Sequence, residues 1–212
     1  MVTLAVQAGG QSRRMGRDKG LVELGGRPLI SHVLERLRHL ADDILVTTNA
    51  PQDYAFLGVR LASDSMPGSG ALPGLATALE AARGERVMVV ACDMPFVRPA
   101  LMAYLLDLAQ EADVVIPRRL GEFEPLLAVY RRICLAPIQA SLAAGQARVI
   151  SFFPSVRVRS VEAAELESVD PSGRSFFNVN TPDDLRQAEA MLTEETDFPI
   201  AAPTTTPGDD PQ

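Results

Sequence analysis

The sequence predicts an α/β protein in which a mostly parallel sheet lies between two layers of helices. Short, nearly continuous apolar runs of strand length alternate with amphipathic stretches of helical period along the chain. Strands that are buried on both faces have such apolar runs, and parallel neighbours need helical crossovers between them. The length of 212 residues is sufficient for one compact domain with a substantial core.

Seven apolar runs bounded by turn residues are the expected strands. They cover residues 3–7, 44–48, 59–62, 87–91, 114–116, 126–130 and 156–161. Apolar residues at helical spacing predict helices over about residues 30–40, 75–82 and 101–108. The last helix is expected to begin at residues 181–184, where Thr181 can cap it and Pro182 suits its first turn.

Residues 1–193 are expected to form a single domain, followed by a flexible acidic tail over residues 194–212. The tail is rich in Pro and Thr, has little apolar surface to bury, and carries five of the seven net negative charges. The domain itself is therefore close to neutral. That balance argues against nucleic acid as a partner, as does an aromatic content of 5% without tryptophan.

The sequence also predicts a cytoplasmic protein that does not bind a membrane. No apolar run approaches the roughly 18 residues that a membrane span needs, and no secretory leader precedes the first expected strand. Cys92 and Cys134 lie beside apolar runs, so we expect two buried thiols rather than a disulfide or a thiolate metal site.

A glycine-rich basic loop follows the first expected strand. Residues 7–21 read Gln-Ala-Gly-Gly-Gln-Ser-Arg-Arg-Met-Gly-Arg-Asp-Lys-Gly-Leu. Glycine N–H groups can face an anion and basic side chains add charge, so we expect this loop to bind phosphate. A basic surface turn is the simpler alternative. The spacing matches neither the Walker loop nor the dinucleotide-binding fingerprint.

This loop resembles the signature motif of the molybdenum cofactor guanylyltransferases, a family of the nucleotidyltransferase superfamily. The matching residues are Ala8, Gly9, Gly10, Ser12, Arg14, Met15, Gly16, Asp18, Lys19 and Leu21. The resemblance extends over about residues 3–192 and implies a three-layer α/β/α Rossmann-like fold with a mostly parallel mixed sheet. It also implies transfer of GMP from MgGTP to the terminal phosphate of molybdopterin, which yields molybdopterin guanine dinucleotide and pyrophosphate, with Mg²⁺ as the cofactor.

The resemblance implies roles for individual residues of this sequence. Lys19 would contact the α-phosphate, and Arg13 or Arg14 would hold the β- and γ-phosphates. Gln7 stands where the family usually has an apolar residue, so we expect it to alter contacts to the guanine edge. Predicted nucleotide contacts are Gln7, Ala8, Gly9, Gly10, Arg14, Lys19, Asn49, Asp64, Gly70 and Asp93; the predicted catalytic residues are Lys19, Arg13 and Asp93.

Loops after the next three strands carry further motifs. Asn49 is a candidate contact for the base or ribose, with Thr47 as the alternative. Asp64 and Gly70 match the family's Asp and its Gly-Pro-Leu-x-Gly turn, although this chain has Gly-Ala-Leu-Pro-Gly. Cys-Asp-Met-Pro at residues 92–95 resembles the family's metal-binding segment, which makes Asp93 the predicted magnesium ligand. A helix cap near residue 99 is the plainer interpretation of that aspartate.

Two later segments resemble those that face the acceptor in the family. They are Gly-Glu-Phe-Glu-Pro-Leu at residues 121–126 and Asn-Val-Asn-Thr-Pro at residues 178–182. Glu124, which replaces a histidine often found there, and Pro125, Asn178 and Asn180 are the predicted acceptor contacts. The two asparagines face the same way if the segment is extended, and they could bind a pterin, a phosphate or metal-bound water; turn residues that cap the last helix are the alternative.

Two other functions remain open at this point. One is a related nucleotidyltransferase that uses CTP or a sugar-phosphate acceptor. Cytidylyltransferases of the superfamily usually have Ala-Ala-Gly where this chain has Ala8-Gly9-Gly10, and this difference favours GTP. The other is a non-catalytic nucleotide-binding module with molybdoenzyme-maturation proteins as partners, but intact Lys19 and Asp93 favour an enzyme.

Overall fold

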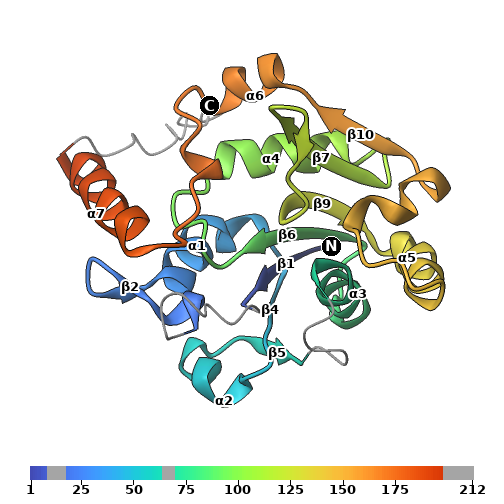
Figure 1. Cartoon of the computed structure of the whole chain (residues 1–212), viewed down its shortest axis with the longest axis horizontal. Helices are drawn as coiled ribbons and strands as arrows, with labels where there is room; N and C mark the ends of the chain where they lie inside the picture. The colour runs from blue at the N-terminus through green and yellow to red at the C-terminus, as the bar shows by residue number, and fades with distance from the viewer. Residues whose placement is uncertain (9–17, 64–69, 198–212) are drawn as a thin grey trace, which may run out of the picture.

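The computed structural model describes residues 1–8, 18–63 and 70–197, with no side chains described for residues 195–197. Across these residues the main sheet has eight strands in the order β10-β7-β9-β6-β1-β4-β5, with β8 paired to β7 (Figure 1). The strands are β1 (Val2–Gln7), β4 (Asp43–Thr47), β5 (Arg60–Ala62), β6 (Arg86–Ala91), β7 (Val114–Arg119), β8 (Glu122–Phe123), β9 (Leu127–Arg131) and β10 (Val158–Val161).

The sheet is mixed because the central strand β9 and the short strand β8 run antiparallel to their neighbours. The pairs β1–β4, β1–β6, β4–β5 and β7–β10 are parallel, whereas β9 is antiparallel to both β6 and β7. The amino end of β9 therefore lies beside the carboxyl end of β6, where the Ala91 N–H donates to the Leu126 carbonyl at 2.9 Å. This reversal brings the segment before β9 to the edge at which the parallel strands end.

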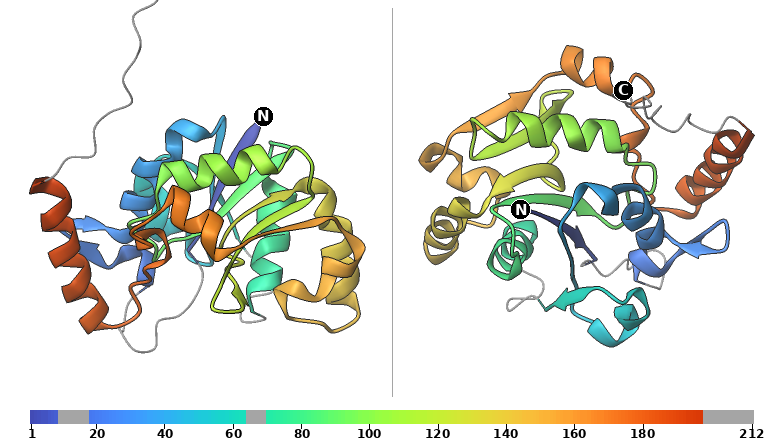
Figure 2. Two further views of the ribbon diagram at one scale, coloured as in Figure 1. Left: turned by 90° about the horizontal axis from the view of Figure 1, so that it is seen from above. Right: turned by 180° about the vertical axis from the view of Figure 1, so that it is seen from behind.

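Helices cover both faces of the sheet, which confirms the predicted three-layer architecture (Figures 1 and 2). One face packs against α1 (Leu29–Leu37), α4 (Pro99–Leu108) and α6 (Ala163–Val169), and the other against α3 (Ala71–Ala81) and α5 (Leu135–Ala143). The short helix α2 (Pro51–Tyr54) follows β4. Alternation along β1 supplies both cores, because Leu4 and Val6 face the first layer and Ala5 faces the second.

In a third, smaller hydrophobic core, residues 22–29 pack against residues 179–188 from late in the sequence. The hairpin of β2 (Glu23–Leu24) and β3 (Arg27–Pro28) lies beside the last helix, α7 (Pro182–Asp197), as Figure 1 shows. The buried residues of this third core are Val22, Leu24, Leu29, Phe96, Val179 and Ala188. The contact is close at the hairpin tip, where a Cβ added to Gly25 would come within 2.6 Å of Leu192.

The expected strands correspond to β1, β4, β5, β6, β7, β9 and β10, and β7 continues three residues beyond the expected end at residue 116. The expected cap of the last helix is confirmed, because the Asp184 N–H donates to the Thr181 hydroxyl at 3.1 Å. Of the flexible tail expected over residues 194–212, residues 194–197 are instead helical, since α7 continues to Asp197, and residues 198–212 lie outside the described residues. Within the described ranges, no helix has the length and apolar character needed to cross a bilayer.

Candidate active site

A cavity of about 300 Å³ lies at the carboxyl ends of β1 and β6. Four separate segments supply its walls: the end of β1 with the turn that follows, the loop after β6, the turn before β9, and the segment before α7. The lining residues are Gln7, Ala8, Asp18, Lys19, Ala91, Cys92, Asp93, Met94, Glu124, Pro125, Leu126, Asn178 and Asn180. The sheet topology thus brings together residues that lie more than 170 positions apart in the sequence.

Lys19 begins a short 3₁₀ turn (Lys19–Leu21) that is fixed by the residue before it. Asp18 accepts hydrogen bonds from the Gly20 N–H at 3.1 Å and from the Tyr54 hydroxyl at 2.5 Å. A Cβ added to Gly20 would lie 2.6 Å from that hydroxyl oxygen, so only glycine fits this turn. Asp18 was not among the predicted site residues; the available signal was its position in the motif immediately before Lys19.

The Lys19 amine links three parts of the chain. Its Nζ lies 3.1 Å from Oδ2 of Asp93, at the end of β6, and it also donates a hydrogen bond to Oδ1 of Asn180. The Lys19 side chain is 26% exposed and that of Asp93 is 12% exposed, so the ion pair is mostly buried where it lines the cavity. Lys19 is also the single lysine of the chain, whose other 19 basic side chains are all arginines.

Asp93 has one carboxylate oxygen to spare. Oδ1 is buried and has no hydrogen-bond partner among the described residues, a costly arrangement unless a ligand supplies one. Mg²⁺ is commonly held by one or two carboxylates, with phosphate oxygens and water completing its shell. The donor set at Asp93 fits that coordination. Since no group of three metal-ligating side chains occurs in the described ranges, substrate and water would supply most of the other ligands.

The plainer interpretation of Asp93, a cap for the following helix, does not hold. Helix α4 begins at Pro99 after Arg98, and no side chain caps it. Asp93 instead turns toward the cavity, while its carbonyl accepts a hydrogen bond from the Val179 N–H at 2.9 Å. This backbone contact ties the loop after β6 to the segment that carries both asparagines.

Gln7 supplies a second unsatisfied buried group on the cavity wall. It is 8% exposed, and its Nε2 has no hydrogen-bond partner among the described residues. A Cβ added to Gly74 of α3 would lie 3.2 Å from Oε1 of Gln7, so the absence of a side chain at residue 74 leaves room for the amide.

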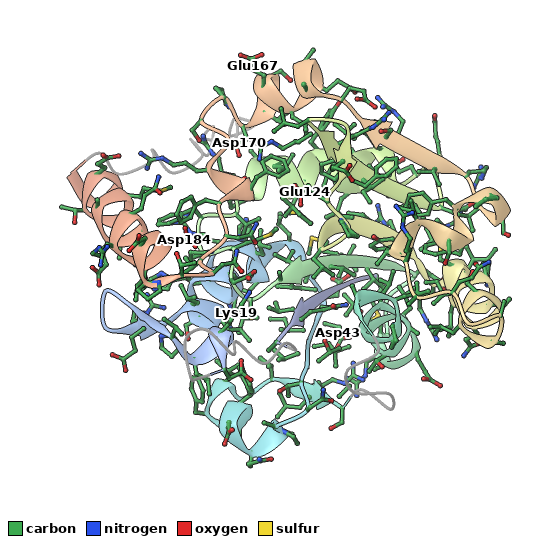
Figure 3. All side chains as sticks on the ribbon, viewed as in Figure 1. Lys19, Asp43, Glu124, Glu167, Asp170 and Asp184 are labelled. Atoms are coloured by element: carbon green, nitrogen blue, oxygen red, sulfur yellow. The ribbon has the colours of Figure 1, made fainter. Side chains whose placement is uncertain are left out.

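The turn between β8 and β9 forms another wall of the cavity. The Glu124 N–H donates to the Pro117 carbonyl at 3.0 Å, and the Tyr130 hydroxyl donates to the Pro125 carbonyl at 2.9 Å. Burial raises the pKa of the Glu124 carboxyl, and the positive charge of Arg119 offsets part of that effect. Figure 3 labels Glu124 and Lys19, which belong to different segments of the chain.

The segment before α7 holds Asn178 and Asn180 at the cavity. Asn178 donates its side-chain N–H to the Phe176 carbonyl at 3.3 Å. Asp184 accepts from the N–H groups of Asn180 at 2.9 Å and Thr181 at 2.8 Å, which fixes the backbone that presents Asn180 to Lys19. The four predicted acceptor contacts therefore line the same cavity as Lys19 and Asp93.

Other predicted site residues are not brought to this cavity. Asn49 is exposed after β4, its alternative Thr47 is buried at the end of that strand, and Gly70 precedes α3 with φ of 99°. None of the three lines the cavity. Gly9, Gly10, Arg13, Arg14 and Asp64 lie outside the described residues, so their roles stay predictions.

Comparison with known proteins identifies a family model that matches residues 4–159, that of the MobA-like NTP transferase domain. A probable molybdenum cofactor guanylyltransferase from Pelotomaculum thermopropionicum is 38% identical, and the aligned region covers 89% of this chain and 92% of that protein. A molybdenum cofactor guanylyltransferase from Desulfosudis oleivorans is 35% identical, with coverage of 90% and 96%.

Solved structures with the same fold include one with appreciable sequence identity. Molybdopterin-guanine dinucleotide biosynthesis protein A from Archaeoglobus fulgidus matches with a TM-score of 0.77 and 29% identity, over 91% of this chain and 99% of that one. A 4-diphosphocytidyl-2C-methyl-D-erythritol synthase from Anaerococcus prevotii matches with a TM-score of 0.67 at 15% identity, over 91% and 98%, and is similar in fold alone.

Proposed function

The chain belongs to the MobA-like NTP transferase family and is a nucleotidyltransferase, and from that premise we propose its reaction. It transfers GMP from MgGTP to the terminal phosphate of molybdopterin, which forms molybdopterin guanine dinucleotide and releases pyrophosphate. Relatives named as molybdenum cofactor guanylyltransferases support guanylyl transfer in molybdopterin biosynthesis as the general activity. The two buried free thiols fit a cytoplasmic enzyme.

One observation carries the proposal: a lysine amine and a carboxylate with a spare oxygen meet in the same cavity. The Lys19–Asp93 distance of 3.1 Å places a positive charge beside a group suited to a divalent cation. Joining a triphosphate to a phosphate acceptor brings anions together, so a site for this reaction must neutralise charge and align the reactants. The paired Lys19 and Asp93 meet the first requirement.

Each of the described site residues has a separate role in the proposed reaction. Lys19 interacts with the α-phosphate and stabilises the charge that grows on its oxygens in the transition state. Asp93 holds the amine in place and presents Oδ1 to the cation, while Asn180 accepts a hydrogen bond from the same amine. When bound, Mg²⁺ would polarise phosphate oxygens and neutralise their charge. No covalent nucleophile is needed, because an acceptor phosphate oxygen attacks the α-phosphorus and pyrophosphate leaves.

Activity of Lys19 variants tests the proposal. With molybdopterin, Mg²⁺ and each nucleoside triphosphate, GTP should give the guanine dinucleotide by mass and release pyrophosphate. Lys19→Ala should lower turnover by roughly 10²–10³-fold, the scale of losing one preorganised electrostatic contact. The matched control is Arg27→Ala, which removes an exposed cation of the β2–β3 hairpin that pairs with Glu35 of α1. Its turnover should equal that of wild type. Wild-type turnover by Lys19→Ala at saturating GTP would contradict the assignment.

The composition of the chain allows a binding assay that does not depend on turnover. An amine-acylating reagent can modify only Lys19 and the terminal amine, since the chain has no other lysine. MgGTP should slow acylation of Lys19 and leave the rate at the terminal amine unchanged, as measured by peptide mass analysis. Equal protection of both amines would mean that the nucleotide does not bind at Lys19.

A further inference from the structure

Glu124 is the charged residue of the cavity whose role the proposed reaction does not explain. The charged residues that line the cavity, within the described part of the chain, are Lys19, Asp18, Asp93 and Glu124. Asp18 is occupied by Gly20 and Tyr54, and Asp93 pairs with Lys19. No hydrogen bond or ion pair to the Glu124 carboxylate occurs among the described residues. Besides Oδ1 of Asp93, which the proposed reaction assigns to the cation, the Glu124 carboxylate is therefore the lining group of negative charge that is available to a ligand.

Arg119 acts electrostatically on Glu124 but forms no ion pair with it. The guanidinium of Arg119 lies over the Phe176 ring, 4.4 Å from the ring centroid. The turn that holds Glu124 is fixed by the hydrogen bonds to the Pro117 and Pro125 carbonyls. The carboxylate is thus half-buried, lies on a turn with a fixed backbone, and receives no hydrogen bond from the described residues.

The charge of Glu124 limits which part of a substrate it can meet. A half-buried carboxylate repels phosphate groups, so the triphosphate and the acceptor phosphate belong at the Lys19 side of the cavity. Guanine and pterin both carry a 2-amino-4-oxo-pyrimidine ring, whose 2-amino group and adjacent ring N–H are two parallel donors. A carboxylate has two acceptor oxygens at the matching spacing and forms strong bonds to such a pair.

We infer that Glu124 is a specificity-determining residue that binds the 2-amino and ring N–H edge of a 2-amino-4-oxo-pyrimidine, in the pterin or in the guanine. The inference rests on the proposed function for the identity of the two substrates. It goes further in naming the atoms that are read and the residue that reads them. Glu124 then places the heterocycle at one wall of the cavity while Lys19 and Asp93 hold phosphate at another.

Ligand pairs that differ only at the 2-position test the inference by binding alone. Pterin and lumazine differ in having a 2-amino or a 2-oxo group, and GTP and ITP differ in having or lacking the 2-amino group. Wild-type protein should prefer the 2-amino member of one pair by about 10–100-fold, the range for one hydrogen bond to a charged group. The pair that shows the preference identifies the ring that is read. Fluorescence quenching measures the pteridines, and protection of Lys19 from acylation measures the nucleotides.

Two variants decide the outcome. In Glu124→Gln the preference should fall to within about threefold, because an amide presents one donor and one acceptor in place of two acceptors. Glu122→Gln, an exposed glutamate two residues earlier on β8, should keep the wild-type preference. Equal preference in wild type and Glu124→Gln, or no preference in either pair, would overturn the inference. So would a Glu124→Gln variant that differs from wild type only in its Mg²⁺ requirement.

The binding assays separate this inference from the proposed function. If wild-type protein makes no guanine dinucleotide but discriminates pterin from lumazine through Glu124, the reaction is wrong and the recognition stands. If the dinucleotide forms at equal rates with Glu124→Gln and wild type under subsaturating acceptor and GTP, the reaction stands and the recognition is wrong.

Discussion

At the scale of single residues, the cavity holds two side chains whose buried polar atoms lack a hydrogen-bond partner in the described part of the chain, Asp93 and Gln7. An unsatisfied buried donor or acceptor costs about 1–3 kcal/mol, so such groups persist where a ligand completes them. For Asp93 the ligand expected is a divalent cation. For Gln7 the buried atom is a donor, and it needs an acceptor such as an oxygen or ring nitrogen of a bound nucleotide.

The unsatisfied amide of Gln7 leads to a prediction about stability and binding together. Gln7→Leu should raise the free energy of unfolding of the ligand-free protein by about 1 kcal/mol, because it removes a buried donor at similar volume. The melting temperature should rise by about 2–4 °C, measured by calorimetry. The same variant should bind GTP more weakly. Gln52→Leu, at an exposed position on α2, is the control and should give no such gain. A less stable Gln7→Leu protein would show that Gln7 is satisfied without ligand.

Motifs in the sequence pointed to side chains that the structure brings to one cavity, but they did not indicate partners that are distant in sequence. Lys19 and Asp93 come after parallel strands, whose carboxyl ends meet at one edge of a sheet, whereas Glu124 precedes β9 and Asn180 precedes α7. The contact of Asp18 with Tyr54 joins residues 36 positions apart. No periodicity or motif indicates that α2 brings a tyrosine hydroxyl to the turn that carries Lys19.

At the scale of elements, the start of α7 connects helix capping to the candidate site. Asp184 and Thr181 cap each other reciprocally, and Asp184 also accepts from the Asn180 N–H. These backbone hydrogen bonds, the Asn180 N–H first, lower the pKa of the Asp184 carboxyl. A helix cap therefore holds the asparagine that contacts the Lys19 amine.

Removing that cap should affect stability and turnover together. Asp184→Ala should lower the free energy of unfolding by about 1 kcal/mol, the usual cost of removing a side chain that caps the start of a helix. It should also lower kcat several-fold, because Asn180 is no longer held beside Lys19. Asp183→Ala is the matched control, since Asp183 is exposed and pairs only with Arg186 among the described residues. Urea unfolding and pyrophosphate release measure the two effects. Indistinguishable results from the two variants would refute a role for the cap.

The elements that could be predicted from the sequence are those that are buried in the sheet, because burial requires a recognisable run of apolar residues. The central strands are apolar on both faces, so each of them was found from composition and spacing. Helix α5 escaped detection because it is rich in alanine and has little contrast between its faces. Helix α6 is short and mostly polar, and a capping box formed by Glu162 and Glu165 stabilises its start.

At the scale of the whole molecule, buried carboxylates set the expected response to acid. Burial on its own raises the pKa of Asp43, but hydrogen bonds from Arg60, Thr3 and the Arg83 N–H more than offset it, so the pKa lies below its ordinary value. The pKa of Asp170 is lowered in the same way against burial, by hydrogen bonds from Ser175 and Ser172. Both groups hold fewer protons in the folded state than in the unfolded state near pH 4.

These two aspartates predict a loss of stability in acid. Because their pKa values are depressed in the folded state, their stabilising effect is complete above the unfolded value of about 3.9. It is lost as the pH falls through the folded-state pKa values. Urea unfolding measured from pH 7 to pH 3 should show little change from Asp43 and Asp170 above about pH 5 and a decline below pH 4. Asp43→Asn should be less stable at pH 7 and should decline less. A wild-type profile that stays flat to pH 3 would contradict this account.

The third core has a consequence for when the enzyme becomes competent during its synthesis. The β2–β3 hairpin near the start of the chain packs on α7, and the Lys19 amine receives its Asn180 partner from the segment just before that helix. A nascent chain that has emerged from the ribosome as far as residue 170 contains every strand of the main sheet but has neither the helix nor the asparagine. A premature stop in that region would therefore yield a product that has every strand of the sheet but an incomplete site, in which the Lys19 amine lacks its Asn180 partner.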